Sequence, residues 1–95
     1  MSYCGMNKEI GECLLEAKTL INGERMKNYG EPGKNIQGIS ELWTTYLGAK
    51  IYPRDVCNMM ILVKVSRDAC VPKHDNQVDI CGYSSIADSC FPDRK

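Results

Sequence analysis

The chain has 95 residues, of which 43% are hydrophobic, and this length allows a single domain with one core. Twelve basic and twelve acidic residues give a formal net charge of zero, which argues against a general nucleic-acid-binding protein. The sequence has no apolar run of the roughly 18 residues that cross a bilayer, and residues 1–11 are too polar for a secretory signal. We therefore expect a cytoplasmic domain spanning residues 1–95, with an ordered core at about residues 7–91 and no membrane partner.

The first part of the chain shows the periodicity of a helix. Apolar residues between about residues 7 and 22 recur at helical spacing and predict a first helix: Ile10, Cys13, Leu14, Ala17 and Ile21. Gly23 is a natural stop. The polar stretch that follows, residues 24–34, contains two glycines and a proline, and this composition predicts a long loop.

Three further helices are predicted. Asn35 is a good N-cap for a helix that continues to Leu47, and Pro53 suits the first turn of another helix that continues to about Ala69. A last helix is expected from Asp75 or Asn76 to about Cys90. The fold class predicted is therefore all-α, a compact bundle of about four helices. Because each helix is modest, we expect oligomerisation to complete the core.

The six cysteines are well separated along the chain: Cys4, Cys13, Cys57, Cys70, Cys81 and Cys90. Structural zinc sites usually show closely spaced ligand pairs, and this pattern has none. A disulfide framework is typical of secreted proteins, which this sequence does not resemble. We interpret the cysteines as reduced residues that pack as small hydrophobes.

Charged residues occur where the helices are expected to be apolar. The predicted helix from Pro53 is apolar nearly all round, which is typical of a central, buried helix, yet it contains Lys64 and Arg67. On the last helix, Asp79 shares a face with apolar residues, and Asp75 lies one turn earlier. A buried charge costs several kcal/mol unless it is paired, on the order given for buried ions. Arg67 and Asp79 are therefore expected to face the inside of the bundle most clearly, whereas Lys64 and Asp75 also have routes to solvent.

Two interpretations fit these charges. The first is a structural ion-pair cluster, in which Arg67 or Lys64 pairs with Asp79 and fixes the register of the helices. The second is a polar pocket for a phosphate or a hydrated Mg²⁺, with Asp75 and Asp79 as the metal ligands and Lys64 and Arg67 as cations that bind the phosphate. Glutamates of the first helix could add ligands, although their spacing is equally that of a solvated face.

The predicted loop supplies a second group of candidate residues. Arg25 and Lys27 precede a helix, a favourable position for binding phosphate, and Tyr29 is suited to stacking on a base. His74, beside the last helix, is a further candidate for contact with a phosphate. The segment lacks the Gly-Lys-Ser/Thr end of a P-loop.

Several motifs resemble an uncharacterised family of small phage and prophage proteins. They are Glu24-Arg25 with Lys27-x-Tyr29-Gly30-x-Pro32, Asn35, Leu42-Trp43-x-x-Tyr46-Leu47-Gly48, Pro53-x-Asp55-Val56-x-x-Met59-Met60-x-Leu62-x-Lys64-x-x-Arg67, Pro72-Lys73-His74 and Val78-Asp79-Ile80-x-Gly82-Tyr83. The resemblance covers roughly residues 10 to 88. It implies a phage or prophage origin, inside a bacterial host, but no settled activity.

The chain is more loosely similar to the MazG-like, all-α nucleoside triphosphate pyrophosphohydrolases. This similarity implies a Mg²⁺-dependent helical bundle that is often oligomeric. The MazG pattern is an E-x-x-E helix followed by an E-x-x-D helix. Glu9-x-x-Glu12 matches the first half by form, whereas Asp75 and Asp79 are four residues apart and depart from the second.

The sequence supports three functional hypotheses. The first is a phage protein with a polar pocket that binds a nucleotide or other phosphate ligand, and this hypothesis leaves open whether the protein depends on Mg²⁺ and whether it is a degenerate pyrophosphohydrolase. The second is a phage-encoded inhibitor or adaptor that binds a host protein, such as a defence factor. The third is a non-catalytic sponge that sequesters a nucleotide signal.

Overall fold

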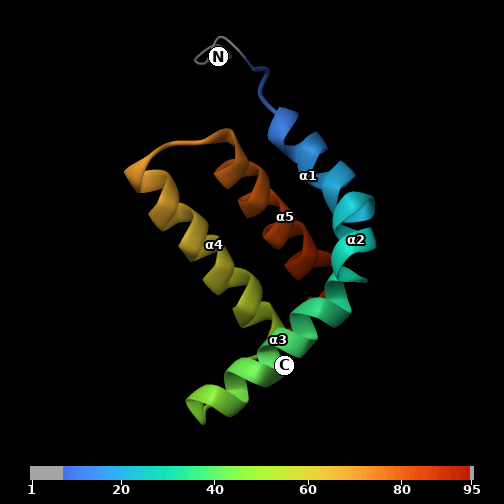
Figure 1. The fold of residues 1–95 in the computed structure, drawn as a ribbon, viewed down its shortest axis with the longest axis vertical. Coiled ribbons are helices and arrows are strands. Elements are labelled where there is room, and N and C mark those ends of the chain that lie inside the picture. Colours follow the sequence, from blue (N-terminus) through green and yellow to red (C-terminus); the bar gives the residue numbers. More distant parts are fainter. Residues whose placement is uncertain (1–7, 95) are drawn as a thin grey trace.

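The computed structural model describes residues 8–94, and this part of the chain is helical and contains no strand (Figure 1). The elements are α1 (Glu12–Asn22), α2 (Glu24–Tyr29), α3 (Pro32–Leu47), α4 (Pro53–Cys70) and α5 (His74–Cys90). The four predicted helices are all present, and the all-α class is confirmed. Asn7, at which the first helix was expected to begin, lies outside the described residues.

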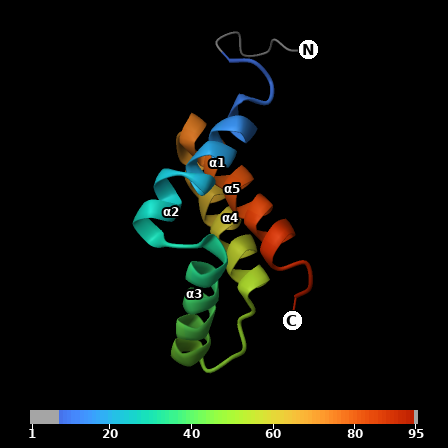
Figure 2. The same ribbon diagram turned by 90° about the vertical axis from the view of Figure 1, so that its right-hand side faces the viewer.

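Helix α5 is the centre of the arrangement. It packs against α4 on one side and α1 on the other, and α2 leads from α1 to α3 (Figures 1 and 2). Helix α3 packs mainly on the beginning of α4 and extends beyond the end of the α4–α5 pair (Figure 1). The main core lies where α3, α4 and α5 meet, and its buried members are Ile36, Val56, Cys57 and Ala87.

The prediction of a loop over residues 24–34 is wrong. Residues Glu24–Tyr29 form α2, and Gly30, with a φ of 80°, ends it in a conformation that favours glycine. Pro32 occupies the first turn of α3, where a missing backbone N–H costs nothing. Asn35 therefore lies inside α3, and its N–H donates to the Glu31 carbonyl at 3.0 Å.

The start of α4 follows the prediction. Pro53 stands in its first turn, and Asp55 accepts a hydrogen bond from the Tyr52 N–H at 3.0 Å. Arg94 donates its Nε–H to the same carboxylate at 3.0 Å, and this hydrogen bond lowers the pKa of Asp55. The C-terminal segment is thereby attached to the beginning of α4.

One face of α4 lies open, so the prediction of a buried central helix is wrong. Val56 and Cys57 are fully buried, but the opposite face exposes Met59, Leu62, Val63 and Val65. The reason is that, within the part of the chain that the structure describes, α3 and α5 are the main packing partners of α4 and lie on one side of it. Within residues 8–94, no helix is both long and apolar enough to cross a membrane.

Candidate functional site

An ion-pair cluster joins three helices around Asp79 of α5. Lys64 of α4 places its Nζ 2.9 Å from the Asp79 Oδ2, and Arg25 of α2 places its Nη2 3.6 Å from the Oδ1. The side chains of Lys64 and Asp79 are 14% and 19% exposed. Of the two cations predicted as alternative partners of Asp79, Arg67 and Lys64, the structure thus pairs Lys64, and Arg25 is an additional partner that the sequence did not indicate.

The other two charges predicted to face inward do not do so. Arg67 is exposed although it lies on the same face of α4 as the buried Val56, because it stands in the last turn of α4, away from α3 (Figure 1). Asp75 is also exposed, because it lies in the first turn of α5, at the open end of the α4–α5 pair. Asp75 therefore does not join Asp79 in one site.

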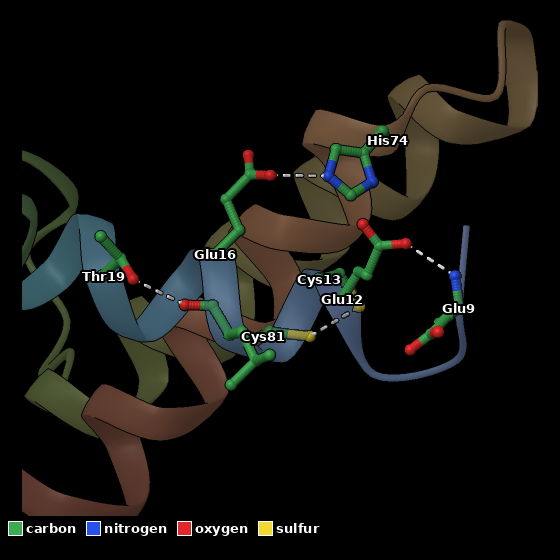
Figure 3. A network of polar contacts seen from close by, with 8 residues as sticks. Glu9, Glu12, Cys13, Glu16, Thr19, His74 and Cys81 are labelled. Carbon is green, nitrogen blue, oxygen red and sulfur yellow. Dashed lines mark hydrogen bonds and ion pairs between the residues drawn. The ribbon is translucent and has the colours of Figure 1, made fainter. Parts of the chain in front are cut away.

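His74 forms a contact between α5 and α1. Its Nε2 lies 2.9 Å from the Glu16 Oε1, and the two side chains point toward one another across the helices (Figure 3). Of the remaining predicted residues, Lys27 is exposed on α2. Tyr29 is the last residue of α2, and its side chain is not among those described.

A pocket of about 230 Å³ lies beside the ion-pair cluster, bounded by α1, α2, α3 and α5. Its polar lining comes from four residues: Arg25, Asn35, Asp79 and Tyr83. The rest of the wall is largely apolar and includes Leu20, Ile21, Ile36, Val78 and Ile86. Pockets that bind small molecules commonly combine apolar walls with a few convergent polar groups.

Tyr83 and Asn35 are pocket residues that the site prediction did not include. Burial, followed by the nearby Asp79 carboxylate, raises the pKa of the Tyr83 hydroxyl. The phenol therefore stays protonated at neutral pH and remains available as a hydrogen-bond donor. Tyr83 lies one helical turn after Asp79, and this spacing is the signal that could have placed both in one site.

The local charge favours an anion. Two cations, Lys64 and Arg25, surround one carboxylate, which leaves one formal positive charge in the ion-pair cluster, of which Arg25 and Asp79 line the pocket. Arg25 is the cation with access to solvent, since its side chain is 49% exposed. A partly enclosed site of this kind attracts phosphate or carboxylate groups more strongly than an open surface does.

The same geometry does not fit a metal ion held by the protein. Both oxygens of Asp79 already face cations, and Asp75 is exposed rather than beside it. Among the described residues, there is no group of three or more His, Cys, Asp or Glu side chains placed to hold a metal. Mg²⁺ prefers several oxygen ligands, which this cluster does not offer.

The fold and the site thus define the class of the protein, an all-α domain with a small charged pocket. Residues 12–91 match the family model described as a domain of unknown function (DUF6378), and the chain belongs to this family. The matched segment runs from the first residue of α1 to just beyond α5.

Two phage proteins are similar to this chain. It is 40% identical over 79 residues to the Gene 55 protein of Mycobacterium phage D29. The aligned segment covers 82% of this chain and 52% of that protein. This chain is also 40% identical over 75 residues to the Gene 55 protein of Mycobacterium phage L5, covering 77% and 48%. The chain spans about half the length of these relatives. No solved structure matches it.

The relatives confirm the predicted resemblance to an uncharacterised phage protein family. The looser similarity to MazG-like enzymes stays a prediction.

Proposed function

We propose that the pocket between α1, α2, α3 and α5 binds a small phosphate-bearing ligand, and that this ligand is a nucleotide. The observation that carries the proposal is the position of Arg25, a half-exposed cation at the edge of a mostly apolar pocket. A nucleotide has matching parts, because its base is flat and largely apolar on its faces and its phosphates are anionic.

Each part of the pocket has a role in this proposal. The base packs on Ile36 and its apolar neighbours, while the amide of Asn35 and the hydroxyl of Tyr83 hydrogen-bond to its polar edge. Arg25 turns from Asp79 toward the phosphate and binds two of its oxygens, a geometry that guanidinium groups favour. Lys64 keeps Asp79 paired when Arg25 moves.

The proposed activity is binding without hydrolysis, as in a protein that sequesters a nucleotide. Hydrolysis of the MazG kind would need carboxylates that hold Mg²⁺ beside the phosphates. Glu9 and Glu12 are both exposed, and Glu12 accepts a hydrogen bond from the Glu9 N–H at 2.6 Å at the start of α1 (Figure 3). The part of α1 that lines the pocket begins later, at Ala17.

Titration calorimetry tests this proposal. The full chain is titrated with ribonucleotides, deoxyribonucleotides, cyclic nucleotides, nucleosides and inorganic phosphate, with and without Mg²⁺. We expect binding of at least one nucleotide, binding of the matching nucleoside at least tenfold weaker, and recovery of the intact ligand after denaturation. Absence of heat with every nucleotide contradicts the proposal, and recovery of a hydrolysed product contradicts binding without turnover.

A second candidate function is protein binding through the open face of α4. Four residues of this face follow the 3-4-3 spacing of a helix-pairing seam: Met59, Leu62, Ser66 and Ala69. The seam contains no charged residue, so it meets a second copy of itself without repulsion, as a two-fold interface requires. We propose a second copy of the chain as the partner, and a host protein is the alternative that the test separates.

Substitution Leu62→Glu is expected to weaken self-association by at least tenfold, because it places a carboxylate in the centre of the seam. Leu15→Glu on α1 is the matched control, since Leu62 and Leu15 are 66% and 69% exposed. Sedimentation over a range of concentrations measures the association. A wild-type protein that stays monomeric contradicts self-association, and a host protein retained by wild type but not by Leu62→Glu supports the alternative.

A further inference from the structure

Two cysteines from distant parts of the sequence meet between α1 and α5. The Sγ atoms of Cys13 and Cys81 lie 3.6 Å apart, although the residues are 68 positions apart in the chain (Figure 3). Both side chains are partly buried. The two sulfurs are thus in van der Waals contact.

Helices α1 and α5 pack directly against one another beside this contact. Ala17 of α1 is buried one turn after Cys13, and Gly82 follows Cys81 on α5. A Cβ on Gly82 would lie 3.6 Å from the Ile21 Cδ1, an ordinary van der Waals distance, so α1 and α5 pack in direct contact here. The helices are therefore side by side at the level of the two cysteines, and no rearrangement of the fold is needed to bring the sulfurs together.

We propose that Cys13 and Cys81 are an oxidation site, at which a reversible disulfide fastens α1 to α5. A disulfide has an S–S distance of about 2.05 Å, so the sulfurs must approach by about 1.5 Å. Small rotations of the two side chains and a slight shift of α1 supply such a movement. Helix α1 can shift because only Ala17 is buried among its residues.

The oxidant in this proposal is a small-molecule disulfide such as glutathione disulfide. One protein thiolate attacks a sulfur of that disulfide, which forms a mixed disulfide and releases one glutathione thiolate. The second protein thiolate attacks the protein sulfur of the mixed disulfide, forms the Cys13–Cys81 bond and releases the second glutathione. Two electrons pass to the oxidant, and the two protons lost by the protein thiols are taken up by the two glutathione thiolates.

Reaction at neutral pH is slowed by the environment of Cys81. Burial and the neighbouring Cys13 thiol raise the pKa of Cys81, and the thiolate is the reactive form. The rate of cross-linking is therefore expected to rise as the pH is raised from 7 to 9.

The cross-link fixes one wall of the pocket. Helix α1 contributes Leu20 and Ile21 to the pocket lining and leads directly to α2, which carries Arg25. This consequence rests on the proposed function, whereas the formation of the disulfide does not.

The experiment uses the full chain in glutathione redox buffers, without ligand. After equilibration the free thiols are alkylated, and the linked peptides are identified by mass spectrometry. We expect a Cys13–Cys81 peptide that has lost two hydrogens and disappears in excess reduced glutathione. The oxidised protein should melt about 10 °C higher than the reduced one, as for a disulfide that closes a long loop.

The variants Cys13→Ser and Cys81→Ala each remove one partner and are expected to abolish the linked peptide and the rise in melting temperature. Cys70→Ser, at an exposed cysteine at the end of α4, is the matched control and should keep both. Circular dichroism of the reduced variants tests whether each is folded. Mixed glutathione disulfides at both positions without the cross-link, or a cross-link to another cysteine, would overturn the proposal. Because the experiment is done without nucleotide, a failure of the proposed nucleotide binding does not change the expected disulfide result.

Discussion

Replacing Asp79 with leucine is expected to lower the free energy of unfolding by about 3 kcal/mol. The substitution leaves the ammonium group of Lys64, whose side chain is 14% exposed, without its carboxylate at 2.9 Å. A cation that is largely removed from water and has no partner is strongly destabilising. The effect should exceed that of most surface substitutions, which stay within about 0.5 kcal/mol.

A double-mutant cycle separates the ion pair from other effects of the substitution. In Lys64→Met the carboxylate of Asp79 keeps Arg25 as a partner, so this variant should lose less stability, about 1 to 2 kcal/mol. The double variant should be more stable than Asp79→Leu alone, because it removes the uncompensated charge. Urea denaturation measures all four proteins.

Asp88→Leu serves as the control, because Asp88 is an exposed aspartate of the same helix. It should change stability by no more than about 0.5 kcal/mol. If Asp79→Leu and Asp88→Leu have equal effects, or if the two effects in the cycle are simply additive, the ion pair does not hold α4 and α5 together as described.

An ion pair between Asp79 and either Lys64 or Arg67 was predictable because all three residues interrupt apolar helical patterns, although the helical wheel favoured Arg67 as the inward cation. The position of Arg67 was not. A helical wheel gives the angle between residues, but α4 is apolar nearly all round, so the wheel does not show which side meets the neighbouring helices. Arg67 shares a face with the buried Val56 but stands in the last turn of α4, so its exposure depends on how far the neighbouring helices extend along α4, which a wheel does not show.

The short helix α2 could not be predicted for a related reason. Six residues make fewer than two turns, and isolated helices of that length are unstable, so local sequence carries little signal for them. Glycines and a proline in the neighbourhood also favour a loop. Yet α2 brings Arg25 to Asp79, so missing this helix also meant missing the third member of the ion-pair cluster. The contact of Cys13 with Cys81 is likewise set by the packing of α1 on α5, to which sequence spacing gives no guide.

Substitution Arg25→Gln is expected to weaken nucleotide binding by about tenfold or more, since hydrogen bonds to charged groups contribute about 1.5–3 kcal/mol. The fold should tolerate the change. The Arg25 side chain is half-exposed, and its contact with Asp79 is long, at 3.6 Å. Exposed ion pairs contribute at most about 1 kcal/mol to stability.

Lys27→Gln is the matched control, because Lys27 is an exposed cation of the same short helix and does not line the pocket. Calorimetry of both variants with the nucleotide that wild type binds best, and with its nucleoside, separates two kinds of attraction. If Arg25 contacts the phosphate, the loss of affinity should be confined to Arg25→Gln and to the nucleotide, and the affinity for the nucleoside should be unchanged. Equal, small losses in both variants that vanish in high salt would instead indicate diffuse attraction by surface charge and would contradict the assignment of Arg25. A loss of nucleoside binding in Arg25→Gln would place Arg25 on the base rather than on the phosphate.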